Sequence, residues 1–391
     1  MQFITNIISV FKYEVSEIGK NRVYLTTLLI LPLATLLFFG VMFGRGSIAN
    51  LPIVVVDNDH SSTSRQLIAM VNATRGIEVT FSSTSTIEAE KLLRRGDAYG
   101  IIFIPEGLER NIYSSNRTDI ECYISGTNLS ASGVIESELQ NCVRTLSTGV
   151  ELSKLKVQGV NSHNAMQEIM PINFLTHIIS NPYVNYGYYL APIFMFMAIA
   201  IFTTLLTTYS VGRELYYSTA PKWMGIASND TIAAIIGKLL PTTIAMILFS
   251  QLSYIIIFII MGMECAGNYL FLSIGSTILI LAYQSVALFI TTITSNMRLA
   301  LSLGGGYSVM AFTFSGITIP AMAMFAAIRP LTNIFPLTWF TEIFIDQAMR
   351  GTPITLSLNP LFSLLLFLFL PLFIIKRLQK ITSEPQYWSK D

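Results

Sequence analysis

The stretch YYLAPIFMFMAIAIFTTLLTTYSVGRELYYSTAPKWMGIASNDTIAAIIGKLLP, residues Tyr188 to Pro241, determines how the whole chain is organised. An apolar run from Tyr188 to Val211 reaches a charged turn, Gly212-Arg213-Glu214, and a polar segment continues from Leu215 to Asp230. Gly237-Lys238 then leads into the next apolar run. A polar elbow between two membrane helices suits docking to something outside the bilayer.

The composition is that of a polytopic membrane protein. Of the 391 residues, 52% are apolar and 12% are charged, so the chain is too apolar for a soluble domain and too long for a single anchor. The 24 basic and 23 acidic residues nearly cancel, and net charge therefore does not indicate nucleic-acid binding. We expect a polytopic α-helical membrane protein with an inserted α/β (α+β) domain.

The N-terminal residues predict a surface helix followed by a membrane span. Residues 1–22 place apolar side chains, among them Phe3, Ile7 and Phe11, on one helical stripe, which is typical of a cytoplasmic amphipathic interfacial helix. The uncharged run 23–43 has about 21 residues, enough at about 1.5 Å each to cross a hydrocarbon core of about 30 Å. A cleaved signal peptide is the alternative, but the run starts late and lacks an obvious small-x-small cleavage site.

Residues 44–187 have the composition of a soluble domain in which strands and helices alternate. Its predicted strands cover residues 51–56, 77–81, 99–104 and 120–124. Its predicted helices cover residues 62–72, 85–95, 108–113 and 132–157. Cys122 and Cys142 fall in this region, where the sequence is consistent both with a disulfide and with two free thiols.

The rest of the chain, 188–375, predicts a bundle of further transmembrane helices. Its apolar runs are 188–211, 239–263, 269–294, 299–319 and 360–375, which with 23–43 make six spans. Residues 320–359 are interrupted by prolines, so we expect short interfacial or re-entrant helices there. Within this segment, Trp339 and the series Glu342, Asp346 and Arg350 predict an amphipathic helix in the headgroup layer.

The basic residues predict the orientation. An N-terminus inside the cell assigns the elbow 212–238, the turn 295–298 and the tail 376–391 to the cytoplasm. These segments are rich in Lys and Arg, whereas the opposite short loop 264–268 has neither. We therefore expect both termini in the cytoplasm and the domain 44–187 outside it.

The sequence lacks an energy source of its own. The apolar runs between 188 and 375 contain no Asp, Glu, Lys, Arg or His, which proton- or ion-coupled transporters usually retain at membrane depth. Neither Gly19-Lys20 nor Gly237-Lys238 belongs to a phosphate-binding loop. If transport is driven, the energy comes from another polypeptide.

Catalytic and metal sites are not predicted either. Asp57, Asp59, His60 and Ser61 resemble a metal cluster, but they follow a strand and precede a helix, where Asp and Ser serve as turn and cap residues. No G-x-S-x-G nucleophile motif is present. His163 and His177 have no acidic or cysteine partners at metal-ligand spacing.

Hydroxyl and amide groups are the polar groups at membrane depth. Those that could line a pathway are Thr204, Thr208, Gln251, Tyr254 and Gln284. Hydrogen bonding between helices, worth about 1 kcal/mol per bond, is the alternative and the commoner use of such residues. Gly304-Gly305-Gly306 predicts close approach of two helices.

The order of several short motifs carries a family resemblance. They are G-R-E at 212–214, G-K-L-L-P at 237–241, F-S-G at 314–316, P-L-T-W-F at 336–340, P-I-V-V-V-D-N-D at 52–59 and G-I-I-F-I-P at 100–105. Together they resemble the type-2 ABC exporter permeases, specifically the drug-export branch with a large extracytoplasmic domain. The resemblance covers nearly the whole chain.

The resemblance implies a subunit of a larger machine in the bacterial cytoplasmic (inner) membrane. Two permease chains, identical or sister copies, would work with two cytoplasmic ABC ATPase subunits, which would bind ATP and magnesium, so this chain binds no cofactor. A periplasmic membrane-fusion protein and an outer-membrane channel are further partners known for this branch. The elbow would carry the coupling helix, with Arg213, Glu214, Lys222 and Lys238 as coupling residues, and the cargo would be amphipathic or hydrophobic compounds.

The elbow also departs from the family pattern. Members usually continue G-R-E as x-E-x-G-T, whereas residues 215–219 read LYYST, which bears on the ATPase surface that the elbow fits. The main alternative function is a receptor or secretion accessory similar to phage-infection proteins, without ATP coupling. A membrane enzyme is the third possible function, and the lack of paired catalytic groups counts against it.

Overall fold

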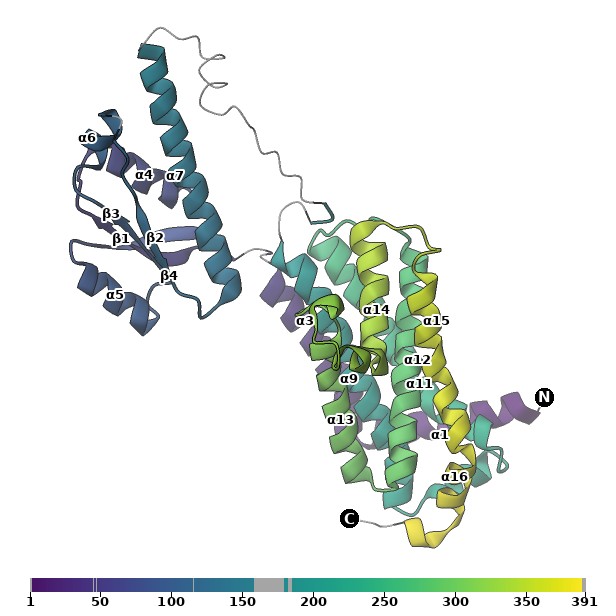
Figure 1. The fold of residues 1–391 in the computed structure, drawn as a ribbon. Coiled ribbons are helices and arrows are strands. Elements are labelled where there is room, and N and C mark those ends of the chain that lie inside the picture. Colours follow the sequence, from purple (N-terminus) through teal and green to yellow (C-terminus); the bar gives the residue numbers. More distant parts are fainter. Residues whose placement is uncertain are drawn as a thin grey trace. The chain divides into compact units, whose positions relative to one another are not determined.

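The computed structural model describes residues 2–44, 46, 48–114, 116–157, 179–181 and 185–388 (Figure 1). Their contacts divide the chain into two units, which we describe separately. One is Ser47–His177, and the other combines Met1–Gly46 with Ile178–Asp391. The predicted boundary of the inserted domain at residue 187 stays a prediction. The location of this domain outside the cytoplasm also stays a prediction.

A four-stranded sheet in the order β2-β1-β3-β4 forms the centre of the inserted unit. β1 (Leu51–Asp57) runs parallel to β2 (Ile77–Ser83) and to β3 (Gly100–Ile104), and β4 (Glu121–Ile124) is antiparallel to β3. Side chains from both faces of β1 are buried, so its unbroken run of apolar, mostly β-branched residues is stable there. All four strands lie close to their predicted positions.

Helices cover both faces of this sheet. They are α4 (Ser62–Asn72), α5 (Thr86–Arg95), α6 (Leu108–Tyr113) and α7 (Leu129–Val157). One buried cluster joins α4, α6 and α7 to the sheet, and a second joins α5 to the other face. α7 begins before the predicted residue 132 because the Asn128 side chain accepts the N–H groups of Ser130 and Ala131, each at 3.1 Å.

Both cysteines of the inserted unit are free thiols. Cys122 is exposed on β4 and Cys142 is buried on α7. The burial of Cys142 within the core explains why a cysteine is compatible with this position without a disulfide.

The other unit contains five helices that are long and apolar enough to cross a membrane, counted over the described residues. They are Arg22–Phe43 (α2, Arg22–Leu25; η1, Thr26–Ile30; α3, Leu31–Phe43), Tyr186–Tyr216 (α9), Thr231–Ile260 (α11, Thr231–Tyr254; η2, Ile255–Ile260), Tyr269–Thr294 (α12) and Leu358–Ser383 (α15, Leu358–Leu366; η6, Phe367–Phe369; α16, Leu370–Ser383). The chain is therefore a multi-pass membrane protein. α1 (Gln2–Lys20) precedes these helices, and η7 (Pro385–Tyr387) follows them.

The sixth predicted span, 299–319, corresponds to a shorter helix, α13 (Met297–Phe314). It is not among the five membrane-length helices, because Arg298 and three consecutive glycines make it less apolar. It packs along α9 and α12 within the same unit. Six spans stay a prediction.

Polar caps set where the long helices of this unit begin. The side chains of Asn185, Asp230, Asn268 and Asn296 accept backbone N–H groups in the first turns of α9, α11, α12 and α13. Such caps satisfy amide groups that no carbonyl within the helix can reach. The prediction from the apolar runs missed these starts by a few residues for α9 and α13, and by eight for α11 (231 against 239).

Residues 320–359 form short helices, as their prolines predict. These are η3 (Ala321–Ala323), η4 (Arg329–Ile334), α14 (Pro336–Phe344) and the π-helical η5 (Ile345–Arg350). The prediction of a polar face along Glu342, Asp346 and Arg350 was wrong at Asp346, whose residue is only 7% exposed. Asp346 accepts a hydrogen bond from Ser357 at 3.4 Å and pairs with Arg350 at 3.1 Å, because η5 turns it back into the protein.

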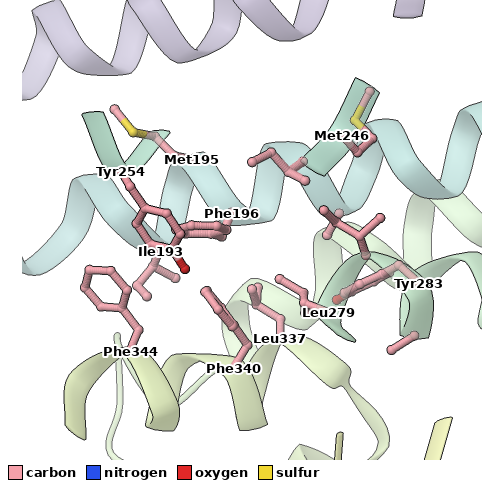
Figure 2. Packing of buried hydrophobic residues seen from close by; sticks show 14 of the residues in the cluster. Ile193, Met195, Phe196, Met246, Tyr254, Leu279, Tyr283, Leu337, Phe340 and Phe344 are labelled. Carbon is pink, nitrogen blue, oxygen red and sulfur yellow. The ribbon is translucent and has the colours of Figure 1, made fainter. Parts of the chain in front are cut away.

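The apolar face of α14 closes the main core rather than lying on lipid (Figure 2). The ring centroids of Phe340 and Phe196 are 4.5 Å apart, and Tyr254 lies 5.2 Å from Phe196 on its other side. α14 thus joins α9, α11 and α12 in a single buried cluster.

Close packing of α9 against α13 depends on Gly304. A Cβ atom added there would lie 2.9 Å from Thr204 Cγ2, whereas one added at Gly306 would meet nothing within 4 Å. We expect Gly304→Leu to lower the free energy of unfolding by about 1–3 kcal/mol, because the added side chain forces the helices apart. Thermal unfolding in detergent measures this, with Gly306→Leu as the matched control. Equal stability of the two variants would contradict the packing.

Candidate functional site

α9 does not stop at the predicted charged turn. It continues through Gly212, Arg213 and Glu214 to Tyr216, and the chain turns only at Ser218, whose φ is +58°. The prediction of a turn at 212–214 was therefore wrong. Because Gly212 packs against Met297, the helix can extend along α13 beyond its apolar run.

The elbow itself is the short helix α10 (Ala220–Ile226), followed by a turn that ends at the Asp230 cap of α11. Trp223 holds α10 in place: its side chain is fully buried, and its indole Nε1 donates to the Ala234 carbonyl at 3.2 Å. Residues of α1, α9, α11, α12 and α16 belong to the same apolar cluster. The elbow is therefore packed into the end of the helical unit.

A buried ion cluster lies beside the elbow. Lys238 Nζ on α11 contacts Glu14 Oε2 of α1 at 2.6 Å and Glu214 Oε1 of α9 at 2.8 Å, and all three side chains have 0% exposure. Arg213 Nη2 lies 3.7 Å from Glu14 Oε2 and 3.5 Å from Glu214 Oε1. The two buried carboxylates thus balance the two cations, and the partly exposed Glu17 adds a third carboxylate 3.8 Å from Arg213 Nη2.

Neutral groups complete the hydrogen bonding of the cluster. The hydroxyls of Tyr24 and Ser210 each donate to Glu14 Oε1 at 2.8 Å, and Thr219 donates to Glu214. Lys238 Nζ also lies 5.0 Å from the centroid of the Trp223 ring. Buried charges need such complete pairing, because a carboxylate left alone in a low-dielectric site is strongly unfavourable.

Burial raises the pKa of the Tyr13 hydroxyl on α1, and the negative charge of Glu214 raises it further. The phenol therefore stays protonated at physiological pH. It faces Glu214 Oε1 at 3.5 Å, a long donor contact that adds α1 to the same cluster.

α1 is packed onto the protein by a line of alternating polar and apolar residues, and most of its apolar stripe faces away. Asn6, Val10, Glu14 and Ile18 are its buried residues, and Asn6 Nδ2 donates to the Ala227 carbonyl of the elbow at 3.0 Å. The apolar stripe stays exposed, with Ile4 63% accessible. An amphipathic helix with this exposure suits the membrane surface.

Of the four predicted coupling residues, Lys222 is exposed, and Arg213, Glu214 and Lys238 are inside the ion cluster. Side chains with no exposed surface, as at Glu214 and Lys238, have no direct contact to offer a partner. Their role in coupling stays a prediction. They would act through contacts inside the protein and not by touching the partner. The sequence reasoning missed Glu14, because its partners Ser210 and Lys238 lie about 200 residues away in the sequence. Only the fold brings them together.

The exposed face of the elbow is what a partner could touch. It consists of Tyr217, Ser218, Pro221, Lys222, Gly225, Ser228 and Asn229. The opposite face of α10 is buried at Trp223 and Met224.

The predicted pathway residues bond one helix to another. Thr204 accepts from Ser308 at 2.9 Å, Tyr254 donates to the Leu272 carbonyl at 2.9 Å, and Gln284 accepts from Thr243 at 3.0 Å. Gln251 bonds Ser273 and Tyr269. These are the interhelical bonds that the sequence offered as the alternative, and lining of a pathway stays a prediction.

Thr208 differs from them. It is fully buried, and its hydroxyl has no hydrogen-bond partner among the described residues. It lies on α9 one turn after Thr204, opposite Gly304.

The residues that resemble a metal cluster form a turn and a helix cap, as predicted. Asp57 accepts the N–H groups of Asp59 and His60, and Ser61 accepts that of Ser64 at 3.0 Å. Over the described part of the chain, no group of three or more His, Cys, Asp or Glu could hold a metal ion. His163 and His177 lie outside the described residues.

Comparison with known proteins gives one match. A family model described as "ABC-2 family transporter protein" matches residues 22–375, nearly the whole chain. No curated protein and no solved structure matches.

Proposed function

Because this chain belongs to the ABC-2 family of transporter proteins, whose membrane subunits pair with ABC ATPases, we propose that it is the permease of an ATP-driven exporter of amphipathic or hydrophobic compounds. ATP and magnesium would bind to the partner ATPase. A second permease copy or a sister chain would complete the transport path in the bacterial inner membrane.

One observation carries the proposal: the elbow is exposed on one face and firmly anchored on the other. A partner that pushes on Lys222 and its neighbours would move α10 as a rigid piece, because Trp223 is seated against α11. The ion cluster then links that movement to α1, α9 and α11 at once. Force applied at the elbow therefore reaches three helices together.

The charge pattern supports the cytoplasmic side for this end. α1, the elbow and α16 share one apolar cluster, and Arg377 of α16 donates to the Thr292 and Ile293 carbonyls at the end of α12. The basic segments of the sequence thus gather at one end of the helical unit, as expected of a face toward the cytoplasm.

Gly225→Trp tests the docking face. A Cβ atom at Gly225 meets nothing within 4 Å, so the indole would project from the elbow without disturbing the fold. We expect at least about a tenfold loss of co-purifying ATPase, which corresponds to about 1.4 kcal/mol of binding. Pulldown in mild detergent with quantified ATPase measures it.

Gly149→Trp is the matched control, because Gly149 on α7 is equally open and lies in the inserted unit. Unchanged ATPase recovery with Gly225→Trp would remove the elbow from the interface. Recovery of the wild-type protein without any nucleotide-binding subunit would favour the receptor function instead.

A further inference from the structure

Two neighbouring cavities share a wall near α14. The first, of about 610 Å³, lies among α12, α13, α14 and the α15–η6 segment, and its walls include Phe289, Tyr307, Leu366 and Phe367. The second, of about 650 Å³, has a mixed wall, in which Arg329, Glu342, Arg350 and several hydroxyl groups lie among apolar side chains. Asn333 and Trp339 line both, and each volume falls in the range of about 300–1,000 Å³ typical of ligand sites.

The apolar cavity suits a hydrocarbon chain. The Tyr307 hydroxyl is already engaged with the Ile334 carbonyl at 2.6 Å, and Trp339 Nε1 with the Asn333 carbonyl at 3.3 Å. The polar side chains left on its lining are Asn333 and Ser363, and the rest of the wall is aliphatic or aromatic.

The wall of the second cavity contains one cationic and one anionic side chain that have no ion pair among the described residues. Arg350 is occupied by Asp346 at 3.1 Å. Arg329 and Glu342, which line the same cavity, have no salt-bridge partner within 4 Å among the described residues. The cavity thus presents separate positive and negative groups to whatever enters it.

The surface around these cavities suits contact with lipid. Between α13 and α14 the chain exposes Met322 (84%), Phe325 (73%) and Ile334 (51%), with Arg329 among them. Exposed apolar side chains beside an arginine and a tryptophan are typical of the boundary between hydrocarbon and headgroups.

We propose that the paired cavities bind a bilayer phospholipid whose head group carries a primary amine, with an acyl chain in the apolar cavity, the phosphate at Arg329 and the ammonium at Glu342. A guanidinium matches a phosphate with two parallel hydrogen bonds. The free carboxylate favours a head group with an ammonium, because it can pair with that cation, whereas phosphatidylglycerol has only neutral hydroxyl groups beyond its phosphate. The site depends on the membrane location of the chain and not on the exporter function.

Native mass spectrometry of the delipidated full-length protein tests this. The probes are phosphatidylethanolamine, phosphatidylglycerol and phosphatidylcholine with identical acyl chains, added at equal concentration. We expect the ethanolamine lipid to bind about tenfold more tightly than the glycerol lipid, as one charge-assisted hydrogen bond of about 1.5–3 kcal/mol allows. Arg329→Gln should weaken all three lipids by about tenfold, whereas Arg95→Gln on α5 should change none.

Two variants separate the parts of the site. Glu342→Gln should remove the preference for the ethanolamine lipid while the phosphate contact persists. Ser363→Trp should fill the apolar cavity and reduce the retention of all three lipids, with size-exclusion chromatography showing that the fold is intact. Equal binding of the three lipids by the wild type, or unchanged binding after Arg329→Gln, overturns the proposal.

Discussion

Lys238→Met is expected to lower the free energy of unfolding by about 3–5 kcal/mol, since it leaves the buried carboxylates of Glu14 and Glu214 sharing a single cation. Arg213, the cation that remains, is at least 3.5 Å from either carboxylate, too far to replace contacts of 2.6 and 2.8 Å. Thermal unfolding in detergent, calibrated by chemical denaturation, measures the loss.

Two further variants make this test specific to charge. Lys222→Met removes an exposed lysine that has no ion pair among the described residues and lies 5.4 Å from the centroid of the Tyr13 ring, so we expect a loss of at most about 1 kcal/mol. Lys238→Met combined with Glu14→Gln should be more stable than Lys238→Met alone, because the second change removes the unbalanced charge. If the double variant is the less stable one, Lys238 acts by packing and the charge balance is not what holds the cluster.

Trp223→Ala is expected to separate ATPase docking from transport. The substitution leaves a cavity between α10 and α11 and should cost about 3–5 kcal/mol of stability. The exposed face of the elbow is untouched, so the ATPase should still co-purify. Substrate-stimulated ATP hydrolysis should fall about tenfold, which corresponds to about 1.4 kcal/mol in the activation barrier.

Trp223→Phe is the control for this experiment. A phenyl ring keeps much of the contact with Lys238 and loses the hydrogen bond to Ala234, so coupling should be largely retained. Full transport activity in a folded Trp223→Ala variant would show that the elbow does not act through this side chain.

The sequence predicted the local elements well, because each has a local cause. β1 follows from an unbroken run of apolar residues, and α4 begins where Ser61 caps it. The helix ends were harder to place. Apolar periodicity locates the part of a helix that lipid or core can cover, whereas the first turn of α11 depends on the cap by Asp230, eight residues before Lys238.

The ion cluster was out of reach of local patterns. Glu14 looks like one polar residue on the hydrophilic side of an amphipathic helix, and the cations that pair with it, Arg213 and Lys238, are far away in the sequence. Its partner Lys238 is 224 positions away. Composition therefore suggested a bundle free of buried charge, and the correction needed the fold, which extends α9 and α11 beyond their apolar runs.

The two sides of α1 have different surroundings. One side of this helix exposes aliphatic side chains, and the other side is bonded to α9 and α11 through Glu14. If α1 lies on the membrane surface as predicted, a bilayer that thins or thickens would move it, and the elbow would follow through the hydrogen bond from Asn6 to Ala227. The position of the elbow would then follow the membrane surface and not the midplane of the bilayer.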